Sequence, residues 1–263
     1  MFRFLKVQKN QLIIALILLL IAATPKLGIA PTALLTIICL GSAIIADLLF
    51  TYLRRRVFFF PRSGIITGFI LTLIIDTSAI WYQAVLISFA AMAIKNFIRP
   101  GGKHIFNPAA SGLAVGWLLF GLQPSWWAPS PYNPTTLFSI PNIPLLIPLA
   151  LIGYVSLYRY RRYFSVASYG IVYFVLLFTT QIATSIATAA SSMINIGTLF
   201  YAFLMLVEPM TSPVKKNRQL LFGASVAVLT VALIHLQKTG GFSLFDVTLT
   251  ALLVSNLLFF RFR

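Results

Sequence analysis

The sequence predicts an all-α integral membrane protein, a single polytopic domain over residues 1–263, that crosses the bilayer about ten times. Three observations support this fold class: the apolar content, the length of the apolar runs, and the basic residues between them. Hydrophobic residues make up 59% of the chain, charged residues only 9%, and the mean hydropathy is +0.94. A soluble domain of this size could not bury so much apolar surface, so lipid must cover part of it.

The apolar runs divide the chain into ten expected spans. A full crossing needs about 20 helical residues, so 64–76, 107–121 and 195–207 are too short to cross as ordinary helices. Each of these three is entered through Gly, Pro, Ser or Asn. The expected spans are 10–27, 31–53, 64–76, 79–97, 107–121, 143–158, 165–187, 195–207, 217–236 and 242–260.

The basic residues test this count and give an orientation. With the N-terminus in the cytoplasm and the side alternating at every span, 18 of the 20 Lys and Arg fall in cytoplasmic segments. Only Lys26 and Lys238 fall outside, the asymmetry expected of a multi-pass protein with both termini cytoplasmic. Despite the net charge of +16, nucleic acid is not the expected partner, because these residues lie between apolar runs, where phospholipid phosphates would meet them. The 18 are Arg3, Lys6, Lys9, Arg54, Arg55, Arg56, Arg62, Lys95, Arg99, Lys103, Arg159, Arg161, Arg162, Lys215, Lys216, Arg218, Arg261 and Arg263.

An uncharged loop rich in Pro and Trp, residues 122–142, separates two sets of five spans, repeat one (1–121) and repeat two (143–263). In each set the third span is short, has an early Gly, and ends near an acidic residue, Asp76 or Glu208. Because five is odd, the second set is predicted to be inverted relative to the first. Inverted repeats with broken helices build sites near the bilayer midplane. The alternative is ten unrelated helices, some of them short by accident.

Two segments combine a helix start with small or polar residues. Ser63 is the expected N-cap of the third span, and Gly64 and Gly68 lie one turn apart on one face. Such a face allows either a flat ring to approach or another helix to pack closely. Asn107 as N-cap with Pro108 at the first helical position predicts another helix start. Its N–H groups would either face an anion or polar ligand, or serve the helix alone.

Three of the four acidic residues are candidate functional carboxylates. Glu208 lies in a turn with two prolines at the edge of a short span, where an unpaired carboxylate is costly. It therefore either pairs with a basic residue of 215–218 or serves a site. Asp47 lies within the second span and is either functional or part of a structural interhelical hydrogen bond. Asp76, at the end of the third span, is the third candidate.

Metal and haem chemistry are not indicated. Cys39, the only cysteine, lies in an apolar run, so the chain has no internal disulfide or Cys-ligated cluster of its own. His104 and His235 are predicted on opposite sides of the membrane, so they cannot both ligate one haem, and they are interpreted as interfacial. No Ser-His-Asp, HExxH or P-loop pattern occurs in the sequence.

Three motifs in one order resemble a known family. They are the S-G-x-x-T-G start at 63–68, the F-N-P-A helix start at 106–109, and the E-P-x-T-x-P turn at 208–213, which is followed by R-x-x-L-F-G at 218–223. From about residue 60 onward the sequence resembles the NqrB/RnfD family, membrane subunits of the sodium-pumping NADH:quinone oxidoreductase and of the Rnf ferredoxin:NAD oxidoreductase. The resemblance implies an electron-conducting membrane subunit with two inverted five-helix repeats, similar in architecture to urea transporters, that carries flavin.

The chain departs from these relatives in one motif. They typically carry FMN esterified to the Thr of an S-G-A-T sequence, which this chain lacks, the 122–142 loop offering only Asn-Pro-Thr-Thr at 133–136. The expected cofactor is therefore flavin, FMN or riboflavin, bound non-covalently or lost. Hydroxyl, amide and glycine groups at the half-helix ends would contact the flavin ring. Cytoplasmic Lys and Arg would bind the phosphate, if the flavin has one. The expected cofactor-binding residues are Ser63, Gly64, Thr67, Gly68, Asn107, Thr211 and Ser212.

The leading interpretation is a membrane-embedded electron-transfer subunit of an Rnf- or Nqr-like redox complex, with ion transport as a coupled process. It would need other membrane subunits and flavin or iron–sulfur subunits as partners, because the chain has no nicotinamide fold and no iron–sulfur ligands. It would then have no independent catalytic activity. The alternative is a urea-transporter-like channel or transporter for small solutes. A third possibility is a scaffold that has lost its cofactor and only holds an assembly together.

Overall fold

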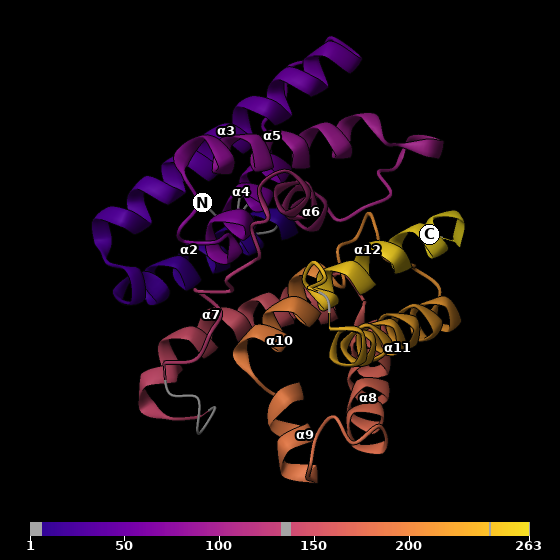
Figure 1. Cartoon of the computed structure of the whole chain (residues 1–263). Coiled ribbons are helices and arrows are strands. Elements are labelled where there is room, and N and C mark those ends of the chain that lie inside the picture. The colour runs from indigo at the N-terminus through magenta and orange to yellow at the C-terminus, as the bar shows by residue number, and fades with distance from the viewer. Residues whose placement is uncertain (1–6, 133–137, 242, 263) are drawn as a thin grey trace.

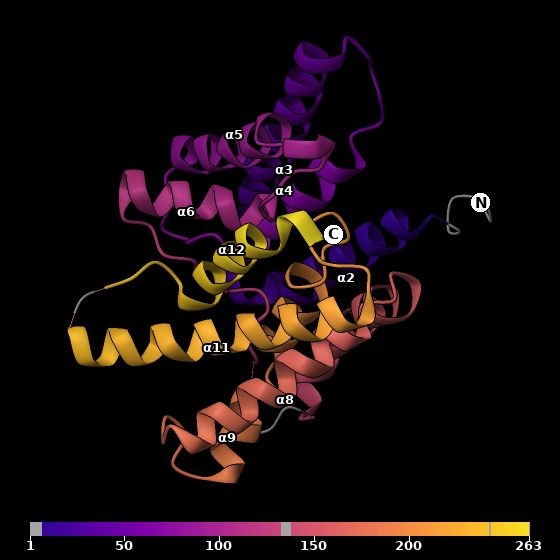
Figure 2. The same ribbon diagram turned by 90° about the vertical axis from the view of Figure 1, so that its right-hand side faces the viewer.

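The computed structural model describes residues 7–132, 138–241 and 243–262, and within these residues every regular element is a helix. Arg3, Lys6, Arg263 and the loop stretch 133–136 lie outside the described residues. Figure 1 shows the helices of the first half, indigo to magenta, gathered apart from the orange and yellow helices of the second half. Viewed from the side, α12 lies between the two groups (Figure 2), and it packs on both α6 and α11.

The first half contains five α-helices, and each coincides with one of the first five expected spans. Proline at the first position and the side chain of Asn107 begin α6, as the sequence predicts. Gly121, with φ 70°, ends this helix in the left-handed conformation that favours glycine. The helices are α2 (Gln8–Leu27), α3 (Ile29–Arg55), α4 (Arg62–Ile74), α5 (Trp81–Phe97) and α6 (Pro108–Phe120), with a short 3₁₀ turn at Pro100–Gly102.

The second half also places a helix at each expected span, but with two differences in bounds and one added helix. The segment expected at 165–187 stops at Thr179, the first residue of a polar Thr-Thr-Gln sequence in which Gln181 takes φ 56°. The segment expected at 242–260 begins only at Val247. The elements are α7 (Ile143–Gly153) with Tyr154–Arg159, α8 (Tyr163–Thr179), α9 (Ile186–Met193), α10 (Ile196–Phe200) with Tyr201–Met205, α11 (Lys216–Gly240) and α12 (Val247–Phe259), with 3₁₀ turns at Ile140–Asn142 and Phe260–Phe262.

Helix length and apolarity separate full spans from shorter elements. Among the described residues, four helical segments are long and apolar enough to cross a membrane. A fifth candidate is the pair Ile186–Met193 and Ile196–Met205, bent by 47°. The helices α4, α6 and α12 have 13 residues each, about 20 Å at 1.5 Å per residue, so they are too short for a bilayer core of about 30 Å. The four long segments are Gln8–Leu27, Ile29–Arg55, Ile140–Arg159 and Lys216–Gly240.

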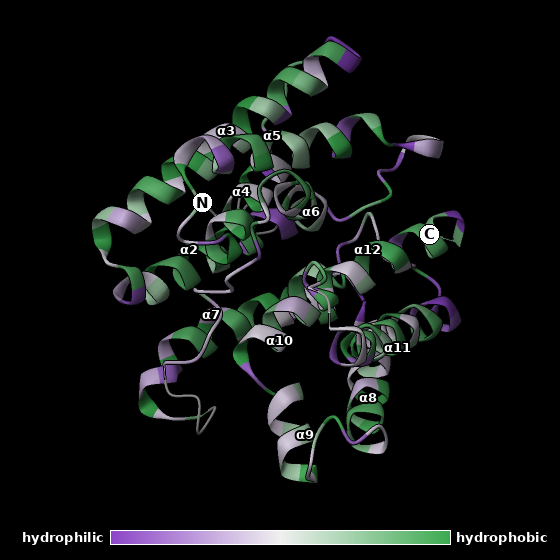
Figure 3. Cartoon of the chain, viewed as in Figure 1, coloured by the Kyte–Doolittle hydropathy of each residue, from purple (hydrophilic) through white to green (hydrophobic). Residues whose placement is uncertain are grey.

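Large apolar side chains cover much of the outside of the molecule. Ile29 is 80% exposed, Leu118 71% and Ile37 70%. Figure 3 shows the same pattern, with apolar colour along most helices and hydrophilic colour at ends such as that of α3. Such a surface is typical of a protein that lipid surrounds.

Glycine lets the main helix pairs approach closely. A Cβ on Gly68 of α4 would lie 2.7 Å from the Cα of Leu40 on α3. A Cβ on Gly223 of α11 would lie 2.2 Å from the carbonyl oxygen of Ser165 on α8. Small residues at these positions allow backbone contact between helices, which is how helices associate in lipid.

Candidate functional site

Buried polar groups gather where α3, α4 and α5 meet, and we call this set the Asp47 cluster. Its members are Asp47, Ser63, Gly64, Lys95 and Asn96. The Lys95 ammonium donates to Asp47 Oδ1 at 2.6 Å and also to the Ser63 hydroxyl. Asp47 is fully buried and Lys95 is 8% exposed. A buried pair with such additional hydrogen bonds offsets part of its desolvation cost.

The Asp47 cluster corrects the expected cap of the third span. Pro61, not Ser63, occupies the N-cap position of α4. The acceptor for the first turn comes from another helix, since the Gly64 N–H donates to Asp47 Oδ2 at 3.0 Å. Of the two interpretations of Asp47, the interhelical structural contact is therefore present.

A second polar group, the Glu208 cluster, lies around the turn after α10 and consists of His104, Arg162, Glu208, Thr211 and Ser212. Glu208 Oε1 lies 3.0 Å from His104 Nε2, and the Thr211 hydroxyl is 3.1 Å from Oε2. Of the two alternatives for Glu208, the pairing with a basic residue of 215–218 is not among the ion pairs of the described residues, and the carboxylate contacts His104 instead. His104 is 4% exposed, so it is a buried partner of Glu208.

Arg162 of this cluster and the neighbouring Tyr160 have shifted pKa values. Burial, and secondarily the charge of Glu208, raises the pKa of Tyr160 to about 12. Burial lowers the pKa of Arg162, whose Nε donates to the Ser212 hydroxyl at 2.9 Å. Tyr160 is therefore a neutral hydrogen-bonding group at physiological pH.

Asn107 joins the two halves of the chain. Its side chain accepts from the Ala110 N–H at 3.1 Å and donates to the Met205 carbonyl at 3.3 Å. Its own N–H donates to Asn256 of α12 at 2.9 Å. The Ser111 N–H also donates to the Asn107 carbonyl. The N–H groups of Asn107, Ala110 and Ser111 at this helix start are therefore bonded to protein acceptors.

The remaining expected site residues have packing or local roles. Gly64 and Gly68 face α3, so the close helix packing that the sequence left open is present. Thr67, between them in sequence, is 5% exposed. Asp76 accepts from the backbone and hydroxyl of Ser78, both at 2.8 Å, in an exposed turn.

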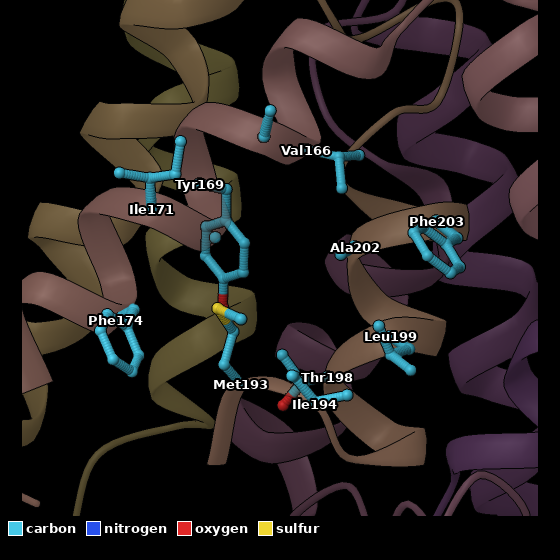
Figure 4. A pocket seen from close by; sticks show the side chains of 12 residues that line it. Val166, Tyr169, Ile171, Phe174, Met193, Ile194, Thr198, Leu199, Ala202 and Phe203 are labelled. Atoms are coloured by element: carbon cyan, nitrogen blue, oxygen red, sulfur yellow. The ribbon is translucent and has the colours of Figure 1, made fainter. Parts of the chain in front are cut away.

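An apolar cavity of about 430 Å³ lies between α8 and the α9–α10 segment, and we call it the α8–α10 cavity. Figure 4 shows Tyr169 and Phe174 on one side and Leu199 and Phe203 on the other. None of the seven expected cofactor-binding residues lines it. Its lining residues are Val166, Ala167, Tyr169, Gly170, Ile171, Phe174, Met193, Ile194, Thr198, Leu199, Ala202 and Phe203.

A smaller cavity of about 170 Å³, the aromatic cavity, shares Tyr169 and Thr198 with the α8–α10 cavity. The rings of Tyr169 and Tyr173 stack with centroids 5.4 Å apart and an interplanar angle of 11°. Trp126 is fixed by its indole N–H, which donates to Asp246 Oδ2 at 2.8 Å. The lining residues are Trp126, Tyr169, Tyr173, Gly197, Thr198, Tyr201 and Thr248.

Sequence reasoning did not identify Lys95, Asp246 or the aromatic cavity as parts of a site. Lys95 carried a signal, because it falls inside the expected span 79–97, where a charge requires a partner. The signal at Asp246 was weaker: an Asp directly before an apolar run is typical of a helix N-cap. The aromatic residues come from segments far apart in the sequence, and no local pattern links them.

The helical fold, the four or five candidate spans of the described residues and the apolar outer surface indicate a multi-pass membrane protein. Residues 5–138, just over half of the chain, match the NQR2, RnfD, RnfE family, and the chain belongs to this family. It is therefore a membrane subunit of the Rnf/Nqr kind. A comparison with curated proteins gives no match.

Proposed function

We propose that this chain is the electron-transfer subunit embedded in the membrane within an Rnf- or Nqr-like redox complex. Family membership is the observation that carries the proposal. Partner subunits are part of it, because the described residues contain no group of His, Cys, Asp and Glu that could hold a metal ion. The electrons must then enter and leave through neighbours, with ion transport as the coupled process.

The proposal includes ten crossings in two inverted repeats, and helix pairing supports it. In the first half α5 packs on both α3 and α6, and in the second half α11 packs on both α8 and α12. Between the halves, α2 contacts α7 and α6 contacts α12. Pairs of corresponding helices meet in this way when a two-fold axis relates the halves.

The directions of α6 and α12 support inversion. The start of α6 is bonded to Asn256 near the end of α12. Beyond the end of α6, the Gln123 side chain accepts from the N–H of Asp246 at the start of α12, at 3.1 Å. The two short helices thus run antiparallel, as corresponding elements of inverted repeats do.

We place a non-covalent flavin in the α8–α10 and aromatic cavities rather than against α4. At α4 a ring would have to separate the helix from α3, since even a Cβ on Gly68 overlaps Leu40. The α8–α10 cavity, at about 430 Å³, is within the range of about 300–1,000 Å³ typical of small-molecule sites. Stacked tyrosines and the indole of Trp126 suit a planar ring. Bound flavin would supply one- and two-electron transfer.

The cavity lining favours a flavin without phosphate. Among the residues that the structure describes, no Lys or Arg lines either of the two cavities. A phosphate there would be a buried charge without a partner, which is costly. Of the two flavins that the family resemblance implies, riboflavin therefore fits these residues better than FMN.

The first test is the flavin content of the complex purified with its partner subunits in mild detergent. We expect flavin absorbance in the wild type, and its release by acid without a covalent remainder. Tyr169→Ala, which alters both cavities, should lower the flavin content at least severalfold. The matched control is Tyr158→Ala, since Tyr158 is 73% exposed and lines neither cavity.

The outcomes separate the alternatives. Loss of flavin in Thr67→Val but not in Tyr169→Ala would place the ring at α4 instead. An assembled complex without flavin would contradict the cofactor assignment and favour a scaffold. Liposomes containing the chain alone should show no urea flux, whereas rapid flux would favour the solute channel.

A further inference from the structure

Three arginines come together where α3 and α5 end, and we call them the arginine triad: Arg54, Arg55 and Arg99. The Arg54 guanidinium lies 3.4 Å from the Asn96 side-chain oxygen of α5. Arg99 follows α5 by two residues and donates to the Lys95 carbonyl at 3.3 Å and to the Gly102 carbonyl. Both helices therefore deliver positive charge to one place at the same end of the molecule.

The triad has no carboxylate of its own. Among the described residues the two ion pairs are Lys95 with Asp47 and His104 with Glu208, and neither includes a triad member. Asp47, the acidic group whose charge acts on Arg54 and Arg99, is hydrogen-bonded to Lys95 and the Gly64 N–H. Burial, and then the neighbouring charges of Arg54 and Arg55, lowers the pKa of Arg99. Three like charges are thus held close together, and the charge of Asp47, which acts in the opposite direction on Arg54 and Arg99, offsets their repulsion only in part.

Hydrogen-bond donors of the triad are also unused. The Arg99 Nε is buried without a hydrogen-bond partner. Arg54 and Arg55 are exposed, and the fork of a guanidinium is suited to two oxygens of one phosphate. The site therefore offers an anion both charge and directed donors.

Apolar side chains border the triad on its outer side. Phe97, 57% exposed, packs edge-on against Phe50 with centroids 5.4 Å apart. Phe58 is 78% exposed and Leu53 is 51% exposed. Figure 3 shows the change along α3 from apolar colour to hydrophilic colour at this end. The combination is a charged site next to an apolar surface at the edge of a membrane protein.

We propose that the arginine triad binds the headgroup phosphate of an anionic phospholipid, with an acyl chain lying along Phe97 and Phe50. A phosphodiester between guanidinium groups supplies the negative charge that the triad lacks beyond Asp47. The adjacent phenyl rings suit the apolar part of an amphiphile. A small soluble anion would leave these rings uncovered. Juxtamembrane Lys and Arg of this kind attract anionic lipid.

The test compares two triple variants of the full chain, purified with its partner subunits. Arg54→Gln/Arg55→Gln/Arg99→Gln removes the triad while leaving hydrogen-bonding side chains. Lys215→Gln/Lys216→Gln/Arg218→Gln is the control, since it removes the same charge at another place, the start of α11. Lipids retained by each complex are counted by native mass spectrometry, with phosphatidylglycerol and phosphatidylcholine added in turn. Thermal unfolding without lipid checks that both variants fold.

We expect the wild type to retain phosphatidylglycerol over phosphatidylcholine by about tenfold or more. The triad variant should lose this preference, and the control variant should keep it. Equal loss of the phosphatidylglycerol preference in both variants would overturn the proposal. It would mean that the preference depends on the total positive charge and not on a specific site. Displacement of the lipid by an equal concentration of inorganic phosphate would also overturn it. So would unchanged lipid retention with loss of a partner subunit, which would assign the triad to an acidic protein surface.

Discussion

Buried charges at Asp47 and Lys95 tie three helices together at the level of single residues. The sequence indicated Asp47, because a carboxylate within an apolar run requires a partner. It could not identify that partner, because Lys95 lies 48 positions away and the positive-inside rule places it in a cytoplasmic segment. The same holds for Glu208, whose partner His104 lies 104 positions away. Helix packing, not local spacing, decides such pairs.

Removing one partner of the buried pair should be costly. We expect Lys95→Met to reduce the free energy of unfolding by about 3–5 kcal/mol, because Asp47 is left buried without its counter-charge. The measurement is reversible unfolding of the purified protein in mixed micelles. The double variant Asp47→Asn/Lys95→Met should recover a large part of that loss. Additive losses in the double variant would mean that the two side chains do not act as a pair.

At the level of helices, sequence patterns located the elements better than their ends. Each expected span coincides with a helix, and the three short ones are short as predicted. The sequence did not predict that α12 is also short, because the apolar run that defines the expected span 242–260 includes residues 243–245. Asp246 begins the helix instead, its carboxylate accepting from the N–H groups of Thr248 and Leu249. Capping geometry overrides hydropathy at such boundaries.

Close packing of α4 on α3 depends on Gly68. Because an added Cβ would lie 2.7 Å from Leu40 Cα, we expect Gly68→Ala to lower the free energy of unfolding by about 1–3 kcal/mol through overpacking. Gly41→Ala is the matched control in α3, since a Cβ there would meet nothing within 4 Å. It should be neutral or stabilising by up to about 1 kcal/mol through helix propensity. Equal effects at both positions would argue against the α3–α4 contact.

At the level of the whole molecule, the two halves share helix pairing but differ in how tightly two helices approach. In the first half, glycine contacts close the space between α3 and α4. In the second half, the 430 Å³ cavity lies between α8 and the α9–α10 segment. The sequence predicted matching short spans but not this difference, because the separation of helices depends on side chains from several segments. The half with the open space is therefore the one to examine for a ligand.

Orientation in the membrane can be tested at the two ends of α11. Its 25 residues extend about 37 Å, enough to cross a bilayer core of about 30 Å. In a background without the buried Cys39, single variants Asn217→Cys and Thr239→Cys place a thiol at exposed positions at either end. The positive-inside rule predicts that a membrane-impermeant maleimide labels position 239 in intact cells and position 217 only after permeabilisation. The reverse pattern would invert the proposed topology, and labelling of both positions in intact cells would exclude α11 as a crossing helix.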